Sequence, residues 1–222
     1  MSLPKEFTHL FDKTDELCQP VIYWKGILYS LAKTAAETSH WFGGEMPPCQ
    51  GIGSPATHRH LLTIDLEPFD IRLPGREKAG RLPCMFNFDL ESLSTDYVVE
   101  GGSIQFDHPL AVFGADEASP DAELPYDSFP DTFPISYLEI VETLPIDFDT
   151  LQEHFTSQGL FGTFGEDDVS DRFFVILPEY KALKTSLWAA PDDPDAYLSA
   201  GNICIFQLDP TTGRVDASNQ CT

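Results

Sequence analysis

The feature that most constrains the fold is a dense run of turn-forming residues in front of two short apolar segments. Residues 43–57 contain four glycines and three prolines. Such a run does not continue a helix or a sheet, because proline lacks a backbone donor and glycine loses much freedom on ordering. In residues 60–66 and 82–89 apolar side chains recur at every second position, which predicts two strands. We therefore expect residues 39–89 to form the centre of the fold.

A second copy of this pattern lies near the C-terminus. Residues 200–209 match residues 79–89 with one gap, and each segment follows an apolar strand, 173–177 and 61–66 respectively. The faces expected to be buried correspond, namely Cys84, Phe86 and Phe88 in the first copy and Cys204, Phe206 and Leu208 in the second. Two copies of a strand–connection–strand unit would pack as a pseudo-symmetric pair.

The N-terminal part predicts helices. Residues 4–18 place apolar side chains near one face at helical spacing, and Pro20 ends the run. Residues 21–38 begin like a strand but favour a helix in their second half. Asp149 and Gln152 resemble a capping box that opens a short helix ending near residue 157. The sequence therefore predicts an α+β fold with mixed or antiparallel sheets, the duplicated unit and N-terminal helices.

The length of 222 residues suits one domain with four parts. These parts are an N-terminal helical part (1–38), a first repeat half (39–113), an acidic connection with a short helix (114–171) and a second repeat half (172–210). No segment has the roughly 18 apolar residues that a membrane span needs, and residues 1–6 lack the apolar run of a signal peptide. We expect a cytoplasmic protein.

Negative charge is concentrated in the middle of the chain. The protein has 36 acidic and 13 basic residues, and residues 91–180 hold 20 of the acids but a single base, Arg172. Such a surface repels nucleic acid and anionic lipid, so neither is expected as a partner, and it attracts basic proteins. Within residues 114–134, acids surround apolar anchors, as at a protein-binding rim and core. The residues expected to bind a basic partner are Tyr126, Phe129, Asp121, Glu123, Asp127 and Asp131. The alternatives are that the aromatic side chains hold this segment to its own domain and that the charge only maintains solubility.

A metal site is a second hypothesis. His58 and His60 lie on the same side of an extended chain, a spacing that metal sites use. Asp65 is the preferred third ligand, with Glu45 or His108 as alternatives, and two solvated histidines are the simpler interpretation. Cys49 lacks the following helix that would activate a nucleophilic thiol. No catalytic or cofactor-binding signature is present, so no cofactor is expected.

Three short patterns resemble the YwqG-like family of uncharacterised bacterial proteins. They are Ser39 with Gly43-Gly44 and Pro47, then Leu61-Leu62-x-Ile64-Asp65, then Gly80-x-Leu82 with aromatic strand residues, and a weaker echo at 201–206. Where the family usually carries a lysine and a glutamine, this chain has Trp41-Phe42 and Thr63. The resemblance implies an α+β bacterial cytosolic protein and brings no established activity.

These observations favour a non-catalytic, acidic protein-binding module, of the immunity or inhibitor type. One alternative is a metal-assisted hydrolase that uses His58 and His60. Another is a small-ligand-binding module with a cleft between the two repeat halves.

Overall fold

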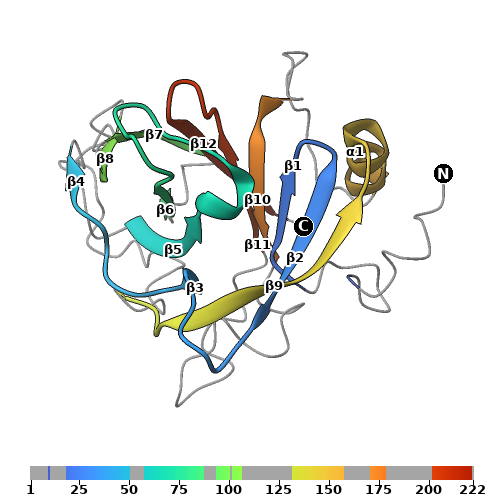
Figure 1. Ribbon diagram of the computed structural model, residues 1–222, viewed down its shortest axis with the longest axis horizontal. Coiled ribbons are helices and arrows are strands. Elements are labelled where there is room, and N and C mark those ends of the chain that lie inside the picture. The colour runs from blue at the N-terminus through green and yellow to red at the C-terminus, as the bar shows by residue number, and fades with distance from the viewer. Residues whose placement is uncertain are drawn as a thin grey trace, which may run out of the picture.

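A computed structural model describes Leu10 and residues 19–50, 58–87, 94–100, 102–106, 132–157, 171–178 and 202–221. Its dominant feature is a single 12-stranded sheet with the order β4-β8-β7-β12-β11-β10-β1-β2-β9-β3-β5-β6 (Figure 1). The strands are β1 (Val21–Trp24), β2 (Ile27–Lys33), β3 (His40–Phe42), β4 (Cys49–Gln50), β5 (His58–Asp65), β6 (Arg81–Asn87), β7 (Ser94–Glu100), β8 (Ser103–Phe106), β9 (Ser136–Pro145), β10 (Phe173–Leu177), β11 (Asn202–Leu208) and β12 (Arg214–Cys221). Neighbouring strands are antiparallel, except that β4 and β8 are parallel.

The predicted α+β fold class is wrong, because the described part of the chain is nearly all β. It contains one α-helix, α1 (Phe148–Ser157), and a 3-10 turn, η2 (Glu67–Phe69), and its N-terminal part begins with strands. The segment expected to be helical after residue 24 is β2, which forms a hairpin with β1. Lys25 and Gly26 connect the two strands with φ angles of 47° and 78°, the positive values that two-residue hairpin turns need. The helix predicted for residues 4–18 lies outside the described residues apart from Leu10.

The short helix is confirmed, but its capping residue lies two positions earlier than predicted. The carboxylate of Asp147 accepts hydrogen bonds of 2.8 Å from both the backbone N–H and the hydroxyl of Thr150. These bonds satisfy an N–H group that the first turn of a helix leaves unpaired, and they hold the pKa of Asp147 below its usual value. Asp147, and not Asp149, therefore caps α1. No helix among the described residues is long and apolar enough to cross a membrane.

The two echoed segments, β6 and β11, both pair antiparallel with the apolar strand that precedes them. The expected burial of Cys84, Phe86, Cys204, Phe206 and Leu208 is confirmed, since all five are fully buried in one core, while Phe88 lies outside the described residues. The positions of the strands differ, however, because β6 ends the sheet and β11 lies in its interior. The chain therefore builds one continuous sheet and not separate repeated sheets.

The sheet buries both of its faces near its middle. The inner face carries the larger core, which runs from β5 and β6 across β10 and β11 to β12 and β7. On the opposite face, α1 covers β1 and β10, where Phe148 packs against Tyr23 and Phe174. Alternation explains this arrangement, because in β10 Phe173 and Val175 face the inner core while Phe174 and Ile176 face the helix side.

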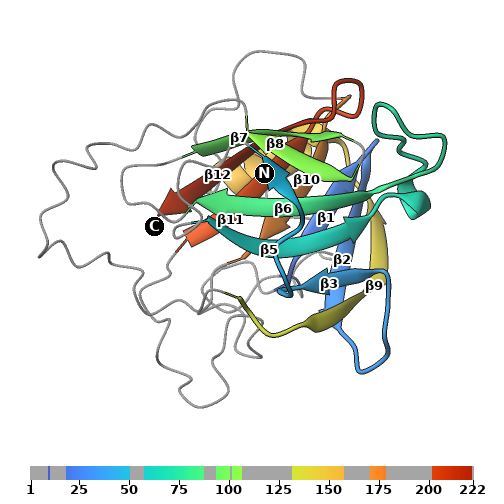
Figure 2. The ribbon, with the colours of Figure 1, turned by 90° about the vertical axis from the view of Figure 1, so that its left-hand side faces the viewer.

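The sheet curls so that its last strand, β6, returns to β7 and β12 (Figure 2). β6 and β7 are not paired as neighbouring strands, but the hydroxyl of Tyr97 on β7 joins them. It donates a hydrogen bond to the carbonyl oxygen of Pro83 and accepts one from the backbone N–H of Met85, both 2.9 Å long. Tyr97 is fully buried, and burial raises the pKa of its hydroxyl well above the usual value. One side chain thus provides hydrogen-bond partners for two backbone groups at the edge of β6, which would otherwise be buried and unpaired.

The glycine pair of the central turn is required by a close backbone contact. Gly43 has a φ angle of 72°, and a Cβ atom there would lie 2.5 Å from the carbonyl oxygen of Pro134. The N–H of Gly44 donates a 2.8 Å hydrogen bond to the carbonyl oxygen of Phe133. Phe133 itself is buried against Phe42, with ring centroids 5.3 Å apart. This contact fastens the residues in front of β9 to the turn after β3.

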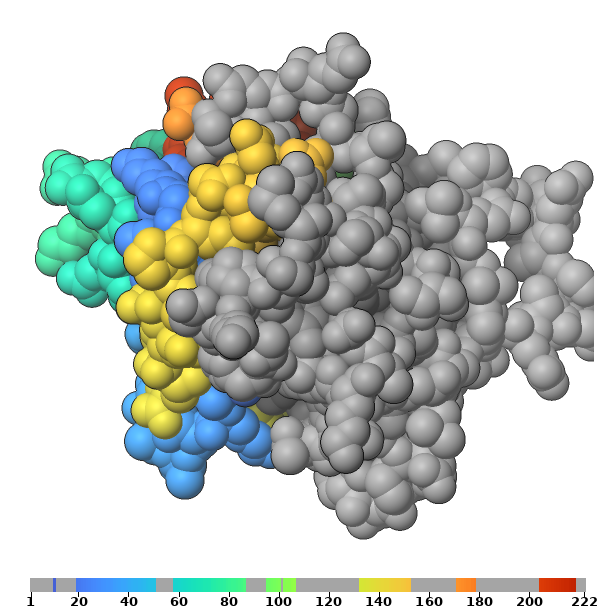
Figure 3. Space-filling view, turned by 90° about the vertical axis from the view of Figure 1, so that its right-hand side faces the viewer, coloured from blue at the N-terminus to red at the C-terminus, as the bar shows by residue number. Residues whose placement is uncertain are grey.

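β9 shows that the predicted acidic connection contributes to the sheet. β9 occupies residues 136–145, within the stretch 114–171, and it lies between β2 and β3. Part of it is at the surface (Figure 3), where Val141 is 51% exposed, and Ile135, directly before the strand, is 55% exposed. β7 and β12 were not predicted, because their outward side chains are polar and their inward ones few.

Replacing Tyr97 with Phe should lower the free energy of unfolding by about 1–3 kcal/mol, because it leaves the buried N–H of Met85 without a partner. Tyr29→Phe is the matched control, since the Tyr29 ring packs against Phe69 and no hydrogen bond involves its hydroxyl in the described structure. Urea unfolding of the two variants measures the difference. Equal stability of the two variants would contradict this role for Tyr97.

Candidate functional site

The loop between β5 and β6, residues 66–80, is held rigidly against the sheet by apolar side chains. Its buried residues are Leu66, Phe69, Ile71 and Leu73. Phe69 packs edge-on against both Tyr29 and Phe173, with centroids 5.0 Å away in each case, and its carbonyl oxygen accepts a hydrogen bond from the indole N–H of Trp24. The polar side chains of the loop are therefore carried by a fixed backbone.

Next to this loop, the outer face of β3, β5 and β6 forms a polar floor. Trp41, Thr63 and Pro83 are cross-strand neighbours in one row, and Asp65 and Arg81 are neighbours in the next. These side chains point away from the core because alternate residues, such as Leu62 and Ile64, point into it. The sheet thus displays an aromatic ring, a hydroxyl, a carboxylate and a guanidinium together.

The floor and the loop line a pocket of about 520 Å³ that is open to solvent. Its lining residues are Trp41, Pro47, Thr63, Asp65, Glu67, Arg76, Ala79, Gly80, Arg81, Pro83, Val99 and Gly102. They come from four separate segments of the chain, including the turn between β7 and β8. The volume lies in the range of roughly 300–1,000 Å³ that small-molecule sites occupy.

Arg76 crosses the pocket between two glycines. A Cβ atom on Gly80 would lie 3.3 Å from an Nη atom of Arg76, and one on Gly102 would overlap its guanidinium. Gly102 also has a φ angle of 91°, which other residues rarely adopt. The guanidinium group of Arg76 fits here because neither position carries a side chain.

The second guanidinium, that of Arg81, lies 4.9 Å from the ring centroid of Trp41. Such a cation–π contact orients the group without neutralising its charge. The ion pairs found among the described residues use Arg172 and Arg214, and neither Arg76 nor Arg81 takes part in one there. The pocket therefore holds two arginines that form no ion pair with a described acid, in a protein whose net charge is −23.

His40 fixes the position of Asp65 at the pocket floor. Its Nδ1 atom accepts a 3.0 Å hydrogen bond from the backbone N–H of Asp65, so the imidazole is neutral. Burial lowers the pKa of His40, and the nearby carboxylate of Asp65 opposes this effect only in part.

His60 holds Thr63 but does not activate it. Its Nε2 atom is 2.9 Å from both the carbonyl oxygen of Leu62 and the hydroxyl oxygen of Thr63. A carbonyl oxygen can only accept, so Nε2 carries the proton and cannot act as a base toward the hydroxyl. Burial lowers the pKa of His60, while nearby backbone carbonyl groups oppose this effect.

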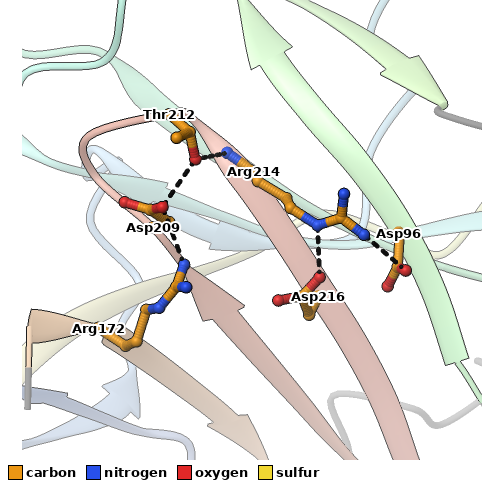
Figure 4. A network of polar contacts seen from close by, with 6 residues as sticks. All are labelled: Asp96, Arg172, Asp209, Thr212, Arg214 and Asp216. Atoms are coloured by element: carbon orange, nitrogen blue, oxygen red, sulfur yellow. Dashed lines mark hydrogen bonds and ion pairs between the residues drawn. The ribbon is translucent and has the colours of Figure 1, made fainter. Parts of the chain in front are cut away.

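A polar network on the outer face supports the turn between β11 and β12, beside the pocket loop (Figure 4). Arg214 contacts Asp96 and Asp216 at 3.0 Å each, and Arg172 contacts Asp209 at 3.1 Å. Burial and then the charge of Asp216 raise the pKa of Asp96, against the effect of Arg214. Burial also acts to raise the pKa of Asp209, but hydrogen bonds from Thr212 and Thr211 outweigh it and lower the value.

The turn that this network supports touches the pocket loop directly. A Cβ atom on Gly213 would lie 3.2 Å from Cδ of Pro74 and 2.8 Å from the carbonyl oxygen of Val99. The carbonyl oxygen of Gly213 also accepts a hydrogen bond from the N–H of Val99. The charged side chains of the network contact one another, and together they support the turn that touches the pocket loop.

The predicted metal ligands are all on β5. His58 is fully buried, with its ring 4.9 Å from that of Phe106, and His60 is 5% exposed. Asp65 lies at the opposite end of the strand from His58. Among the described residues, no three His, Cys, Asp or Glu side chains are grouped closely enough to hold a metal ion. The metal site stays a prediction. Cys49 lies in β4, and burial raises the pKa of its thiol to about 11, which opposes a thiolate.

The residues predicted to bind a basic partner, 121–131, lie outside the described part of the chain, so that site also stays a prediction. The pocket was missed by sequence reasoning. One signal was available: residues 66–81 carry four of the 13 basic residues, Arg72, Arg76, Lys78 and Arg81, against three acids. A basic segment is unusual in a chain this acidic. Whether it forms a binding site depends on which other segments of the chain fold next to it.

Comparison with known proteins adds no relative. No protein-family model matches the chain, and neither a curated protein nor a solved structure is significantly similar to it. Membership in the YwqG-like family stays a prediction.

The buried imidazoles of His40 and His60 should make the protein less stable in mild acid. Both pKa values are lowered in the folded state, so the unfolded chain binds more protons once the pH falls below about 6.5. The free energy of unfolding should therefore fall with decreasing pH from about 6.5 toward the folded pKa values. Urea unfolding between pH 5 and 8 measures the slope, which His40→Gln should reduce. A slope unchanged by this substitution would contradict the contribution of His40.

Proposed function

We propose that the protein is a small-molecule-binding module whose pocket takes an anionic group, a carboxylate or a phosphate. One observation carries this proposal: Arg76 and Arg81 line the same pocket, and no acidic side chain among the described residues pairs with either. In a chain with 36 acids for 13 bases, two guanidinium groups that share a pocket and form no ion pair among the described residues are available to an anionic ligand.

The geometry also supports binding energetically. Arginine presents several N–H donors in a planar fork that matches carboxylate and phosphate oxygens. Arg76 is held between two glycines and Arg81 against Trp41, so little side-chain freedom remains to be lost on binding. The backbone beneath them is fixed by Phe69 and the other buried residues of the loop.

The same pocket argues for binding over catalysis. Its lining contains no His or Cys side chain among the described residues, and its single hydroxyl belongs to Thr63. That hydroxyl is held by the donor atom of His60, which therefore cannot act as its base.

Titration calorimetry with inorganic phosphate and with succinate tests this proposal. Arg76→Gln and Arg81→Gln should each weaken binding of at least one of these probes about 10- to 100-fold, because each removes charge-assisted hydrogen bonds. The matched control is Arg72→Gln, which removes the same charge from an exposed position of the same loop outside the pocket. Absence of binding, or an equal loss in the control variant, would exclude the pocket as an anion site.

We propose, as a second and independent function, that the acidic middle of the chain docks a basic protein. The observation that favours it is the distribution of charge, with 20 acids and one base in residues 91–180. Such a field accelerates encounter with a basic partner and weakens as salt screens it. Phe133, at the end of the aromatic-containing segment, is buried in the core and is not available to this partner.

A pull-down at low salt tests the docking function. Capture of a basic protein should fall with Tyr126→Ala, with neutralisation of the four acids Asp121, Glu123, Asp127 and Asp131, and with high salt. Neutralising four exposed acids outside residues 91–180 is the control, namely Glu37, Glu45, Asp70 and Glu77. If capture survives these changes, or falls equally in the control, the docking function is wrong and the acidic charge serves only solubility.

A further inference from the structure

Two carboxylates line the same pocket as the two arginines, and they are held apart from them. Asp65 is directly opposite Arg81 on the neighbouring strand, yet the two side chains form no ion pair in the described structure. Oδ1 of Asp65 instead accepts a 3.1 Å hydrogen bond from the backbone N–H of Glu67, while Arg81 is turned to Trp41. The exposed side chain of Glu67 stands beside Asp65 at the start of η2.

This arrangement gives the pocket two poles of opposite charge. Arg76 and Arg81 form the cationic pole, and Asp65 and Glu67 form the anionic pole. Opposite charges on neighbouring strands normally pair, but here a backbone contact holds Asp65 and an aromatic contact holds Arg81. A ligand that fills the pocket displaces water from both poles, and a charge left dry without a partner is strongly unfavourable. A simple anion would satisfy only the arginines.

We infer that the pocket recognises a zwitterion, a compound that carries both a carboxylate and a primary ammonium group, as free amino acids do. The inference rests on the proposed anion-binding function and specifies its ligand. The carboxylate pairs with Arg76 and Arg81, and the ammonium group donates its hydrogen bonds to Asp65 and Glu67. The apolar edge of the lining, Pro47, Pro83 and Val99, contacts the carbon chain between the two charges.

A series of probes with increasing separation of charge tests the inference. Glycine, 4-aminobutyrate and 6-aminohexanoate are titrated by calorimetry beside acetate, butyrate and hexanoate, which lack the amine, and beside butylamine, which lacks the acid. At least one zwitterion should bind ten times more tightly than its matched acid and than butylamine. If no zwitterion exceeds its matched acid, the inference is wrong.

Variants of the anionic pole provide the second readout. Asp65→Asn keeps an acceptor for the N–H of Glu67 but removes the charge, and Glu67→Gln is its counterpart. Each should weaken the zwitterion several-fold and leave the affinity for the matched acid unchanged or higher. The control is Glu77→Gln, an exposed acid of the same loop outside the pocket lining. A loss of zwitterion affinity in the control equal to that in the two pocket variants overturns the inference.

The two levels of the proposal fail separately. If phosphate or succinate binds through Arg76 and Arg81 but no zwitterion is preferred, only the ligand class is wrong. If phosphate, succinate and every member of the series fail to bind, the anion site and the zwitterion both fall.

Discussion

The fold depends on closing a curled sheet over one apolar core. A sheet with twelve strands exposes a wide inner face unless its ends approach each other. β6 and β7 do so without forming a ladder, and a side-chain hydroxyl takes over the hydrogen bonds that a strand would have made. Tyr97 is suited to this task because its ring fills the core while its oxygen both donates and accepts. The same side chain therefore contributes both to the closure of the sheet and to the packing of the core.

The pocket is a product of this closure. Where β6 approaches β7, the turn after β7 comes to lie opposite the loop between β5 and β6, and Arg76 enters the gap between Gly80 and Gly102. The buried side chain of Phe69 anchors the loop to the sheet, and the turn containing Gly213 contacts the loop at Pro74. The pocket thus joins segments near residues 41, 65, 80 and 102. Asp65 and Arg81 are held there by a backbone and an aromatic contact, and not by an ion pair with each other.

The charge distribution is understood differently once the chain is folded. Along the sequence, acidity is the dominant feature, and it draws attention to residues 91–180. In space, the distinctive feature is a small cationic region in a pocket of an otherwise acidic protein. Asp96 and Asp216 show the usual outcome, since Arg214 lies between them. Arg76 and Arg81 differ from Arg214, because neither forms an ion pair with a described acid.

The sequence alone determined the local features. Alternation predicted β5 and β6, a continuous apolar run predicted β10, and the match to residues 79–89 predicted β11. The turn glycines predicted the break after β3, and the expected apolar faces of Cys84 and Cys204 were found in the core. Tertiary structure decided the rest: that β2 is a strand and not a helix, that the polar β12 lies between β7 and β11, and that Arg76 meets Gly102. The physical reason is that a short apolar run fits either periodicity until a partner strand supplies hydrogen bonds. A pocket built from distant segments likewise has no local pattern by which it could be recognised.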